Sequence, residues 1–451
     1  MRARPVLQGA RAFSAIVLGQ GLSTLGSSMT RFGLGLWVFA TTGDAAAYTK
    51  LLFFAVLPLG LGALVAGPLI DRLDRKRVMV TANVAASLST VAIAALHYGG
   101  VLALWHLYVA LVVNGLANAF VLPAFESSTP LLVPKEALPR AAGLTQMVRG
   151  VELILAPALA GLLIGRAGLG TVFIVDALTF VASLAALMIS SVPSPPPSSG
   201  EGPSSLWTSF ASGVRYIRVR PAFLYLLGFV TWIMFLLPGV GYALVTPLVL
   251  SFSTEEAAGL VISAFGFGSI VGGVALTAWG GPPRRMDGML GAMVVAGVAS
   301  VVLGARESVG WVGAALVVIG ATFVFAIGLN RVIWQTKADP GVLGRIFSLR
   351  IALGVGAQSL GILVAGALAE RVFEPLMASD HGALAATVGA VIGTGDGRGM
   401  ALMFVLVGVI LVVTTSVSAA VPAVRRFEDR LPDYAAADDV GEASSGLKQT
   451  S

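Results

Sequence analysis

The chain lacks cysteine altogether, has only three histidines, and has few charged residues, which make up 12% of its 451 residues. The absence of cysteine excludes disulfide scaffolds, thiol catalysis and cysteine-ligated metals. His97, His106 and His381 do not have the spacing of metal ligands, and the sequence has no glycine-rich phosphate loop ending in Lys-Ser or Lys-Thr. We therefore predict that the protein is not an enzyme, that it uses no metal or other cofactor, and that an ion gradient, not ATP, supplies its energy.

Hydrophobic residues, in contrast, are abundant: they make up 56% of the chain, and the mean hydropathy is +0.89. A chain of this composition is expected to be dissolved in lipid. The net charge is +6, but the cations lie in short turns between apolar runs, which is typical of membrane orientation signals and not of a nucleic-acid-binding face. We expect contact with the lipid bilayer and none with nucleic acid. The first apolar run, residues 13–40, is too long for a cleavable signal peptide.

Twelve apolar runs approach or exceed the length of about 20 residues that a membrane-spanning helix needs. Because helices satisfy their own backbone hydrogen bonds in lipid, these runs predict an all-α membrane protein with twelve transmembrane helices. The predicted spans are residues 13–40, 47–70, 78–98, 104–124, 138–164, 170–190, 222–250, 257–279, 288–304, 310–330, 344–369 and 400–421.

A stretch rich in proline and serine, residues 193–200, divides the spans into six and six and indicates a linker. Behind it, apolar residues recur at helical spacing between arginines, which favours a helix on the membrane surface, with a partner-binding helix as the alternative. The predicted domains are an N-terminal six-helix bundle (1–190), a cytoplasmic linker with an amphipathic helix (191–221), a C-terminal six-helix bundle (222–421) and a disordered cytoplasmic tail (422–451).

Two further patterns indicate internal symmetry and orientation. A short pattern at the start of the fifth span returns, 205 residues later, at the start of the eleventh: Leu138, Arg140 and Leu144 match Leu343, Arg345 and Leu349. With both termini placed in the cytoplasm, the cytoplasmic segments hold 21 of the 29 Lys and Arg residues. This bias predicts a multi-pass protein of the cell (inner) membrane with cytoplasmic N- and C-termini.

Ionisable side chains inside the spans are candidates for function because they are costly to bury in lipid. Arg149 and Glu152 are three residues apart on one helical face, so they can form a structural ion pair, or Glu152 can be a proton-carrying group whose charge alternates during transport. Asp176 is a second candidate for proton coupling, with a packing role as the alternative. Arg31 can meet an anionic group of a substrate or pair with an acid.

Scattered polar and aromatic residues in the predicted cavity helices favour a bulky amphipathic ligand over an ion or a sugar. Taken singly, each of them can also be an ordinary core residue. The candidate cavity residues are Gln20, Arg31, Asn114, Asn118, Trp232, Tyr242 and Gln358.

Two motifs carry a family resemblance. The basic turn at residues 67–77, Gly-x-Leu-x-Asp-Arg-x-x-Arg-Lys-Arg, resembles the loop between the second and third helices of the major facilitator superfamily of secondary transporters, with Asp74 where the family usually has glycine. The segment around Pro157 and Gly161 resembles the fifth-helix motif of the drug and proton antiporters of that superfamily, although Ala156 and Ala160 replace glycines of the strict pattern.

Along most of its length the chain resembles one branch of the superfamily, which contains macrolide efflux proteins and siderophore exporters. It is carried by residues 30–31, 132–136 and 332–345, and the segments 373–376 and 397–399 look like members that accompany peptide natural-product pathways. The resemblance implies the major facilitator fold, with two pseudo-symmetric six-helix bundles and substrate bound between them near the bilayer midplane.

Alternating access is also implied, with a cytoplasmic latch that closes while the cavity faces outward. In this interpretation the acid at the inner end of the second helix faces the start of the eleventh, where a carboxylate is favourable at a helix N-terminus. The alternative is that these charges only fix the topology. The latch residues implied are Asp71, Arg72, Arg75, Glu126, Gly344 and Arg345.

These observations predict a monomeric secondary transporter that exports amphipathic drugs or natural products, such as macrolides, siderophores or peptide-like compounds, in exchange for protons. The alternatives in transport are a lysophospholipid carrier and a solute importer. An alternative of another class is a membrane receptor or assembly factor that transports nothing.

Overall fold

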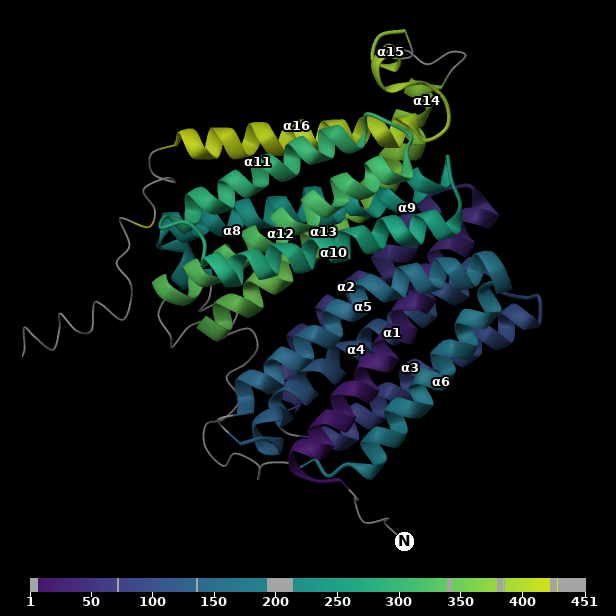
Figure 1. Ribbon diagram of the computed structural model, residues 1–451, viewed down its shortest axis with the longest axis vertical. Coiled ribbons are helices and arrows are strands. Elements are labelled where there is room, and N and C mark those ends of the chain that lie inside the picture. Colours follow the sequence, from purple (N-terminus) through teal and green to yellow (C-terminus); the bar gives the residue numbers. More distant parts are fainter. Residues whose placement is uncertain are drawn as a thin grey trace, which may run out of the picture.

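The computed structural model describes residues 7–70, 73–134, 137–192, 214–338, 343–378, 384, 386–421 and 428. Within these residues the chain is helical apart from turns and one isolated bridge between Leu7 and Ser190. The helices form two bundles, which we call the N-half (residues 7–192) and the C-half (residues 214–421), and the two lie side by side (Figure 1).

The helices of the N-half are α1 (Gly9–Thr42), α2 (Ala45–Ile70), α3 (Arg75–Tyr98), α4 (Leu104–Leu132), α5 (Leu138–Ala167) and α6 (Leu169–Ile189). Those of the C-half are α8 (Pro221–Met234), η2 (Phe235–Gly241), α9 (Tyr242–Leu250), α10 (Glu255–Trp279), α11 (Arg285–Leu303), α12 (Val309–Lys337), α13 (Leu343–Leu368), η3 (Ala369–Phe373), α14 (Glu374–Met377), α15 (Gly389–Ile392) and α16 (Arg398–Ala420).

Eleven helical stretches of the described residues are long and apolar enough to cross a membrane. In the C-half, α8, η2 and α9 together form one such stretch, Pro221–Leu250, and α13 continues through η3 into α14 in another, Ile346–Met377. The 34-residue α1 is more polar, because it carries several serines and threonines as well as Arg31, and it packs between α5 and α6. The predicted all-α membrane fold of two six-helix bundles is confirmed.

The turn before α3 shows what Asp74 does. Its side chain accepts a hydrogen bond of 2.8 Å from the backbone N–H of Arg77, so Asp74 is the N-cap of α3. The equivalent turn before α11 has no local cap, and there the carboxyl group of Glu428 lies against the backbone of Arg285 and Met286. Both halves therefore place an acid at the start of the helix that follows the basic turn.

The two halves meet through small residues on two helix pairs, α5 with α10 and α2 with α13. A Cβ atom on Gly161 would lie 2.6 Å from the carbonyl oxygen of Glu255, and one on Gly366 would lie 2.8 Å from Cα of Ala46. These contacts lie toward the end of the bundles where α1 ends and α2 begins, which we call the opposite end. The terminal end, where α1 begins and α16 ends, is where the ribbons of the two halves diverge (Figure 1).

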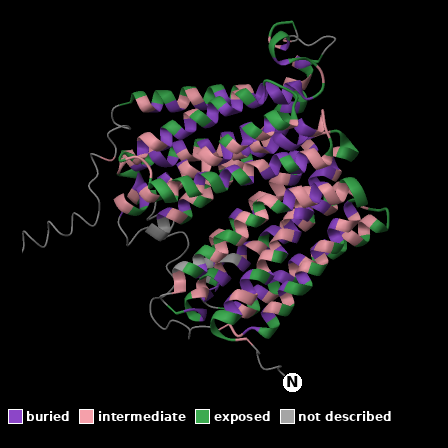
Figure 2. Ribbon diagram, viewed as in Figure 1, coloured by how far each residue is buried: buried purple, intermediate pink, exposed green. Residues whose placement is uncertain are grey.

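The apolar cores of the halves differ. One large cluster of buried residues holds most of the C-half core and includes Leu36 and Ala45 of the N-half. A second, small cluster of the C-half contains Met377, Ile392 and Leu402. In the N-half the buried apolar residues fall into several smaller clusters. Figure 2 shows buried residues along the helices of both halves. Buried polar side chains, including Asn83, Thr90 and Asp176, lie among them.

Two predicted domains fall largely outside the described residues. In the linker, residues 193–213 lie outside them, whereas Ile217 is buried against the C-half and Arg215 and Arg218 are exposed. Of the tail, residues 422–451, only Glu428 is described. The predicted linker helix and the predicted disorder of the tail therefore stay predictions.

Candidate functional site

Three adjoining cavities lie between and within the two halves. Their volumes are about 490, 300 and 420 Å³, and Leu153 of α5 lines all three. Tyr242 lines the first two, while Arg31 and Glu152 line the last two. Because neighbouring cavities share walls, we treat them as one chamber, the central cavity, with a combined volume suited to a drug-sized molecule.

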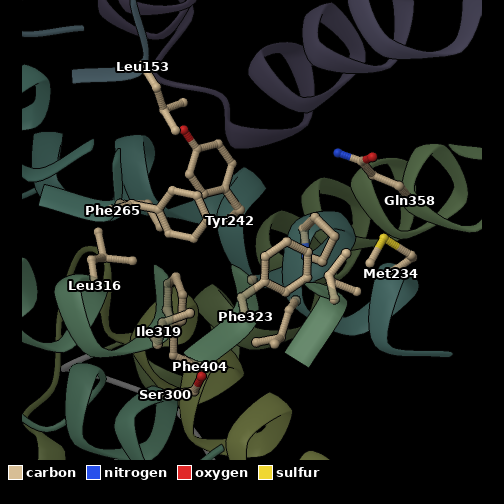
Figure 3. Close-up of a pocket in the computed structure, with 15 residues that line it drawn as sticks. Leu153, Met234, Tyr242, Phe265, Ser300, Leu316, Ile319, Phe323, Gln358 and Phe404 are labelled. Carbon is tan, nitrogen blue, oxygen red and sulfur yellow. The ribbon is translucent and has the colours of Figure 1, made fainter. Parts of the chain in front are cut away.

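The C-half part of the central cavity is apolar and rich in aromatic side chains. Figure 3 shows Phe265 beside Tyr242, whose hydroxyl group points toward Leu153 of the N-half, and Phe265 also contacts Phe323. The few polar groups in this part of the wall belong to Tyr242, Ser300 and Gln358. A pocket of this kind suits the apolar body of a ligand.

A π-helix shapes this apolar wall. Pro238 lies in the seven-residue segment η2 and has no N–H group, so it cannot donate the usual helical bond to the carbonyl group of Met234. The helix widens at this point, and Leu237, Pro238 and Gly241 line the cavity together with Met234. Single-turn π segments inside helices are frequent at functional sites.

The N-half part of the cavity carries charge. The Nη2 group of Arg31 donates a hydrogen bond of 2.6 Å to the hydroxyl oxygen of Ser28, and this hydroxyl donates one of 2.6 Å to Oε1 of Glu152. Arg31 and Ser28 lie on α1, whereas Glu152 lies on α5, and all three are partly buried. The serine thus connects a cation to a carboxylate at the cavity surface, and charge-assisted hydrogen bonds of this kind are strong.

The partner of Arg149 differs from the expected one. Arg149 forms its ion pair with Glu126 of α4 at 3.4 Å, and the two side chains are 40% and 58% exposed. Arg149 also lines the N-half part of the cavity. The prediction that Arg149 and Glu152 share a helical face does not lead to contact between them, because α4 offers Arg149 an acid and α1 offers Glu152 a hydroxyl group. An exposed pair such as Arg149–Glu126 contributes little stability, about 0–1 kcal/mol.

Asp176 lies away from the central cavity. Its side chain is fully buried between α1, α3 and α6, where Oδ2 accepts hydrogen bonds from Thr30 at 2.7 Å and Thr90 at 3.1 Å. Ser27 approaches Oδ1 at 3.4 Å. The acid is thus enclosed by hydroxyl groups inside the N-half.

The other predicted cavity residues are divided among several places. Gln20 and Asn118 line the N-half part of the cavity, while the buried Asn114 lines a separate water-sized space. Gln358 lines the C-half part. Trp232 stacks on Phe235 with ring centroids 5.5 Å apart and is not among the residues that line the three cavities.

Several cavity residues were not predicted from the sequence. They include Ser28, which joins Arg31 to Glu152, and Tyr48, whose hydroxyl group is hydrogen-bonded to Thr246 across the two halves. Ser28 lies three residues before Arg31, so helical spacing was a usable signal for it. No comparable signal marks the aromatic residues of the C-half wall, because buried aromatic residues are common in any apolar helix.

The expected latch is only partly described. Asp71 and Arg72 lie outside the described residues. Gly344 and Arg345 belong to the first turn of α13, but their surroundings are not described. Arg75 donates a hydrogen bond of 2.6 Å to the carbonyl oxygen of Ser127 at the end of α4. Glu126, the other described latch residue, pairs with Arg149 of α5. The described part of the latch therefore ties α4 to α3 and α5 within the N-half.

The antiporter-like segment lies where α5 packs on α10. A Cβ atom on Gly259 of α10 would collide with the carbonyl oxygen of Pro157, and the Gly161 contact with Glu255 lies one turn beyond it. Ser263 of α10 donates a hydrogen bond of 2.6 Å to the carbonyl oxygen of Ile154. The motif therefore forms part of the contact between the halves. Elsewhere in the described part of the chain, no group of three or more His, Asp or Glu side chains could hold a metal ion.

Sequence comparison decides the family. A model of the Major Facilitator Superfamily matches residues 16–362. The chain belongs to the major facilitator superfamily. It is 26% identical over 370 residues to Macrolide efflux protein A of Streptococcus pyogenes. The aligned region covers 80% of this chain and 90% of the efflux protein. Its identity to the multidrug efflux pump Tap of Mycobacterium tuberculosis is 26% over 360 residues, with 74% of this chain and 81% of the pump covered.

Solved structures of other transporters share the fold. The nucleoside transporter NupG superposes with a TM-score of 0.64 at 13% sequence identity, covering 90% of this chain and 98% of NupG. A bacterial homologue of the human lysosomal transporter Spinster, in an inward-facing conformation, gives 0.65 at 17% identity, with 90% and 95% covered. The predicted family and the resemblance to macrolide efflux proteins are confirmed, and this superfamily member is a small-molecule transporter embedded in the membrane.

Proposed function

We propose that this transporter exports amphipathic drugs or natural products, of macrolide, siderophore or peptide-like chemistry, in exchange for protons. The observation that supports it best is the two-sided central cavity, with an aromatic wall in the C-half and the Arg31–Ser28–Glu152 chain in the N-half. An amphipathic substrate places its apolar body against the first wall and its polar group near the second. The efflux proteins among its relatives support the direction of transport.

The orientation follows from the charge bias. The terminal end carries most Lys and Arg residues and therefore lies in the cytoplasm of a cell (inner) membrane protein. In this conformation the close contacts between the halves lie toward the opposite end, and the N-half part of the cavity reaches the terminal end through Val17, Thr145 and Val148. The cavity is then loaded from the cytoplasm, as an exporter requires. One chain encloses the whole cavity, so the functional unit is a monomer.

Within this cycle Glu152 carries the proton. Its carboxylate lies at the cavity surface, where both substrate and protons reach it, whereas Arg149 is paired with Glu126 and Asp176 is enclosed. The latch of Asp71, Arg72 and Arg75 with Arg345 closes the cytoplasmic side when the cavity turns outward. Alternating access then moves substrate and proton in opposite directions.

Inverted membrane vesicles test the proposal. With an imposed proton gradient, uptake of a radiolabelled macrolide is expected to rise above that of vesicles without the transporter and to collapse on addition of a protonophore. Uptake of lysophospholipid instead of the macrolide would favour the lysophospholipid carrier, and uptake of the macrolide only by right-side-out vesicles would favour an importer. The absence of movement of any such compound would favour a receptor or assembly factor.

A further inference from the structure

The buried carboxyl group of Asp176 has no cation to neutralise it. Among the described residues no Lys or Arg nitrogen lies within 4 Å of its oxygens. Oδ2 accepts two hydrogen bonds, from Thr30 and Thr90, but Oδ1 has only the long 3.4 Å contact with Ser27. An isolated carboxylate is very costly to bury. A proton on Oδ1, donated to Ser27, removes that cost and completes the hydrogen bonds of the site.

The nearest cation is Arg31, which also belongs to the cavity. Arg31 is the charged side chain that interacts electrostatically with Asp176, while its Nη2 group holds Ser28 and, through it, Glu152. A space of about 20 Å³, the size of one water molecule, is lined by Arg31 together with Ser27, Thr30 and Thr90. Arg31 therefore borders both the central cavity and the hydroxyl cage around Asp176.

The spacing on α1 explains this arrangement. Ser27 and Thr30 are three residues apart and face Asp176 of α6, whereas Ser28 and Arg31, also three apart, face Glu152 of α5. Two adjacent faces of one helical turn thus hold two acids. The Gly26 position lets α6 approach this turn closely, because a Cβ atom there would lie 2.8 Å from Oδ1 of Asp176.

We propose that Asp176 is a second, buried proton-binding site and that Arg31 shares its charge between Asp176 and Glu152. This inference rests on the proposed proton coupling and deepens it. When a proton or a cationic substrate neutralises Glu152, the charge of Arg31 becomes available to Asp176, which releases its proton. When Glu152 is charged and free, it holds Arg31 through Ser28, and Asp176 keeps its proton. A cationic substrate bound at Glu152 therefore causes Asp176 to release its proton, although the substrate does not contact Asp176.

Few other charges act on either acid. Around Asp176, α3 contributes the uncharged Thr90 and places His97 farther along, against Phe173 at a ring-centroid distance of 5.6 Å. Around Glu152, its own helix contributes Arg149, which α4 pairs with Glu126. The remaining titratable groups in this cavity are the phenols of Tyr48 and Tyr242.

Infrared spectroscopy of the purified full-length protein in lipid nanodiscs tests this linkage without transport. The wild-type protein is expected to show the carbonyl band of a buried protonated carboxyl group at neutral pH, and Asp176→Asn should remove that band. Asp287→Asn, which changes an acid at the start of α11, serves as the matched control and should leave the band in place. A wild-type spectrum without this band, or a band unchanged in Asp176→Asn, would overturn the buried site.

The role of Arg31 is tested by how the band responds to pH. In Arg31→Gln the band should persist to a pH higher by about one unit or more, a tenfold change in the protonation equilibrium. In Glu152→Gln it should disappear at a lower pH than in the wild type, because Arg31 is released toward Asp176. Thr90→Val keeps the carboxyl group but removes one donor to it, and so provides a second shift toward higher pH if Asp176→Asn does not fold.

The outcomes separate this inference from the proposed function. Equal pH responses in Arg31→Gln and the wild type would overturn the shared arginine even if vesicle transport depends on protons. Conversely, shifts in both variants together with macrolide uptake that ignores the proton gradient would support the linkage and refute the proposed coupling. Binding of a cationic macrolide to the wild type should release protons, and Asp176→Asn should reduce the number released.

Discussion

The two halves of this transporter have similar helices but different interiors. Most of the apolar core of the C-half forms one continuous cluster, and this half contributes an aromatic wall to the cavity, whereas the N-half core is divided into smaller clusters. The charged residues that line the cavity, Arg31, Arg149 and Glu152, all belong to the N-half. Two bundles of similar architecture can thus differ in character, with the aromatic surface of the cavity in one half and its charged groups in the other.

Replacing the cavity carboxylate should break this division most severely. Glu152→Gln keeps the hydrogen bond to Ser28 but cannot take up or release a proton. We expect proton-driven macrolide uptake in vesicles to be abolished while exchange of labelled for unlabelled macrolide continues, since exchange needs no net proton movement. Asp287→Asn is the matched control, because that acid lies in the first turn of α11 and does not line the cavity, and it should retain most uptake. Normal proton-driven uptake in Glu152→Gln would move the proton site elsewhere.

The contact between the halves is tested by Gly161→Val. The new Cβ atom would lie 2.6 Å from the carbonyl oxygen of Glu255, so the opposite end could not close as it does here. Overpacking of this kind costs about 1–3 kcal/mol, which shifts a conformational equilibrium roughly tenfold to a hundredfold. We expect macrolide uptake to fall by about that factor.

Labelling of a single introduced cysteine measures where the cavity opens. Because the chain has no cysteine, Thr246→Cys supplies the sole thiol, at a residue that lines the cavity and is 1% exposed. In the Gly161→Val background this thiol should react faster with an impermeant reagent added at the opposite end. Gly143→Ala has space for its methyl group and should leave the reaction rate unchanged. An unchanged rate in Gly161→Val would show that this contact does not control closure.

The apolar wall should have a more modest effect. Phe323→Ala removes an aromatic surface from the C-half part of the cavity, so KM for the macrolide is expected to rise about tenfold with proton coupling intact. Trp232→Ala, which changes an aromatic residue that does not line the cavities, should leave KM within about twofold. If both substitutions raised KM equally, the aromatic wall would not be the binding surface.

The sequence was informative where a property depends on one segment alone. The length of the apolar runs predicts the spans, and the proline-rich linker predicts the two halves. Arg31 and Glu152 stand out as candidates because they are charged residues inside apolar helices, where charge is rare. Pairing between helices could not be predicted in this way. Arg149 contacts Glu126 because of how α4 and α5 rotate against each other, and the cavity lining depends on the widening of the helix at Pro238. Both are tertiary properties that local spacing does not contain.

The smallest expected effect concerns the turns that precede α3 and α11. Asp74 caps α3 from within its own turn, whereas α11 receives its acid from Glu428, far along the chain. Burial raises the pKa of Glu428, although the nearby Arg285 and Lys337 act in the other direction. A raised pKa in the docked state means that docking is strongest when the group is protonated and weakens as the pH rises through the raised pKa.

Hydrogen exchange can measure this difference between the two turns. The backbone amides of Arg285 and Met286 should be better protected at acidic than at slightly alkaline pH, after correction for the intrinsic exchange rate, because docking of the Glu428 carboxyl group covers them. Glu428→Gln should make their protection nearly independent of pH, and Asp439→Asn, which changes another acid of the tail, should not. The amide of Arg77, capped locally by Asp74, should stay protected in both variants. Loss of protection at acidic pH in the wild type would contradict docking of the protonated group, because a carboxyl group with a raised pKa must bind its site more tightly as it gains the proton.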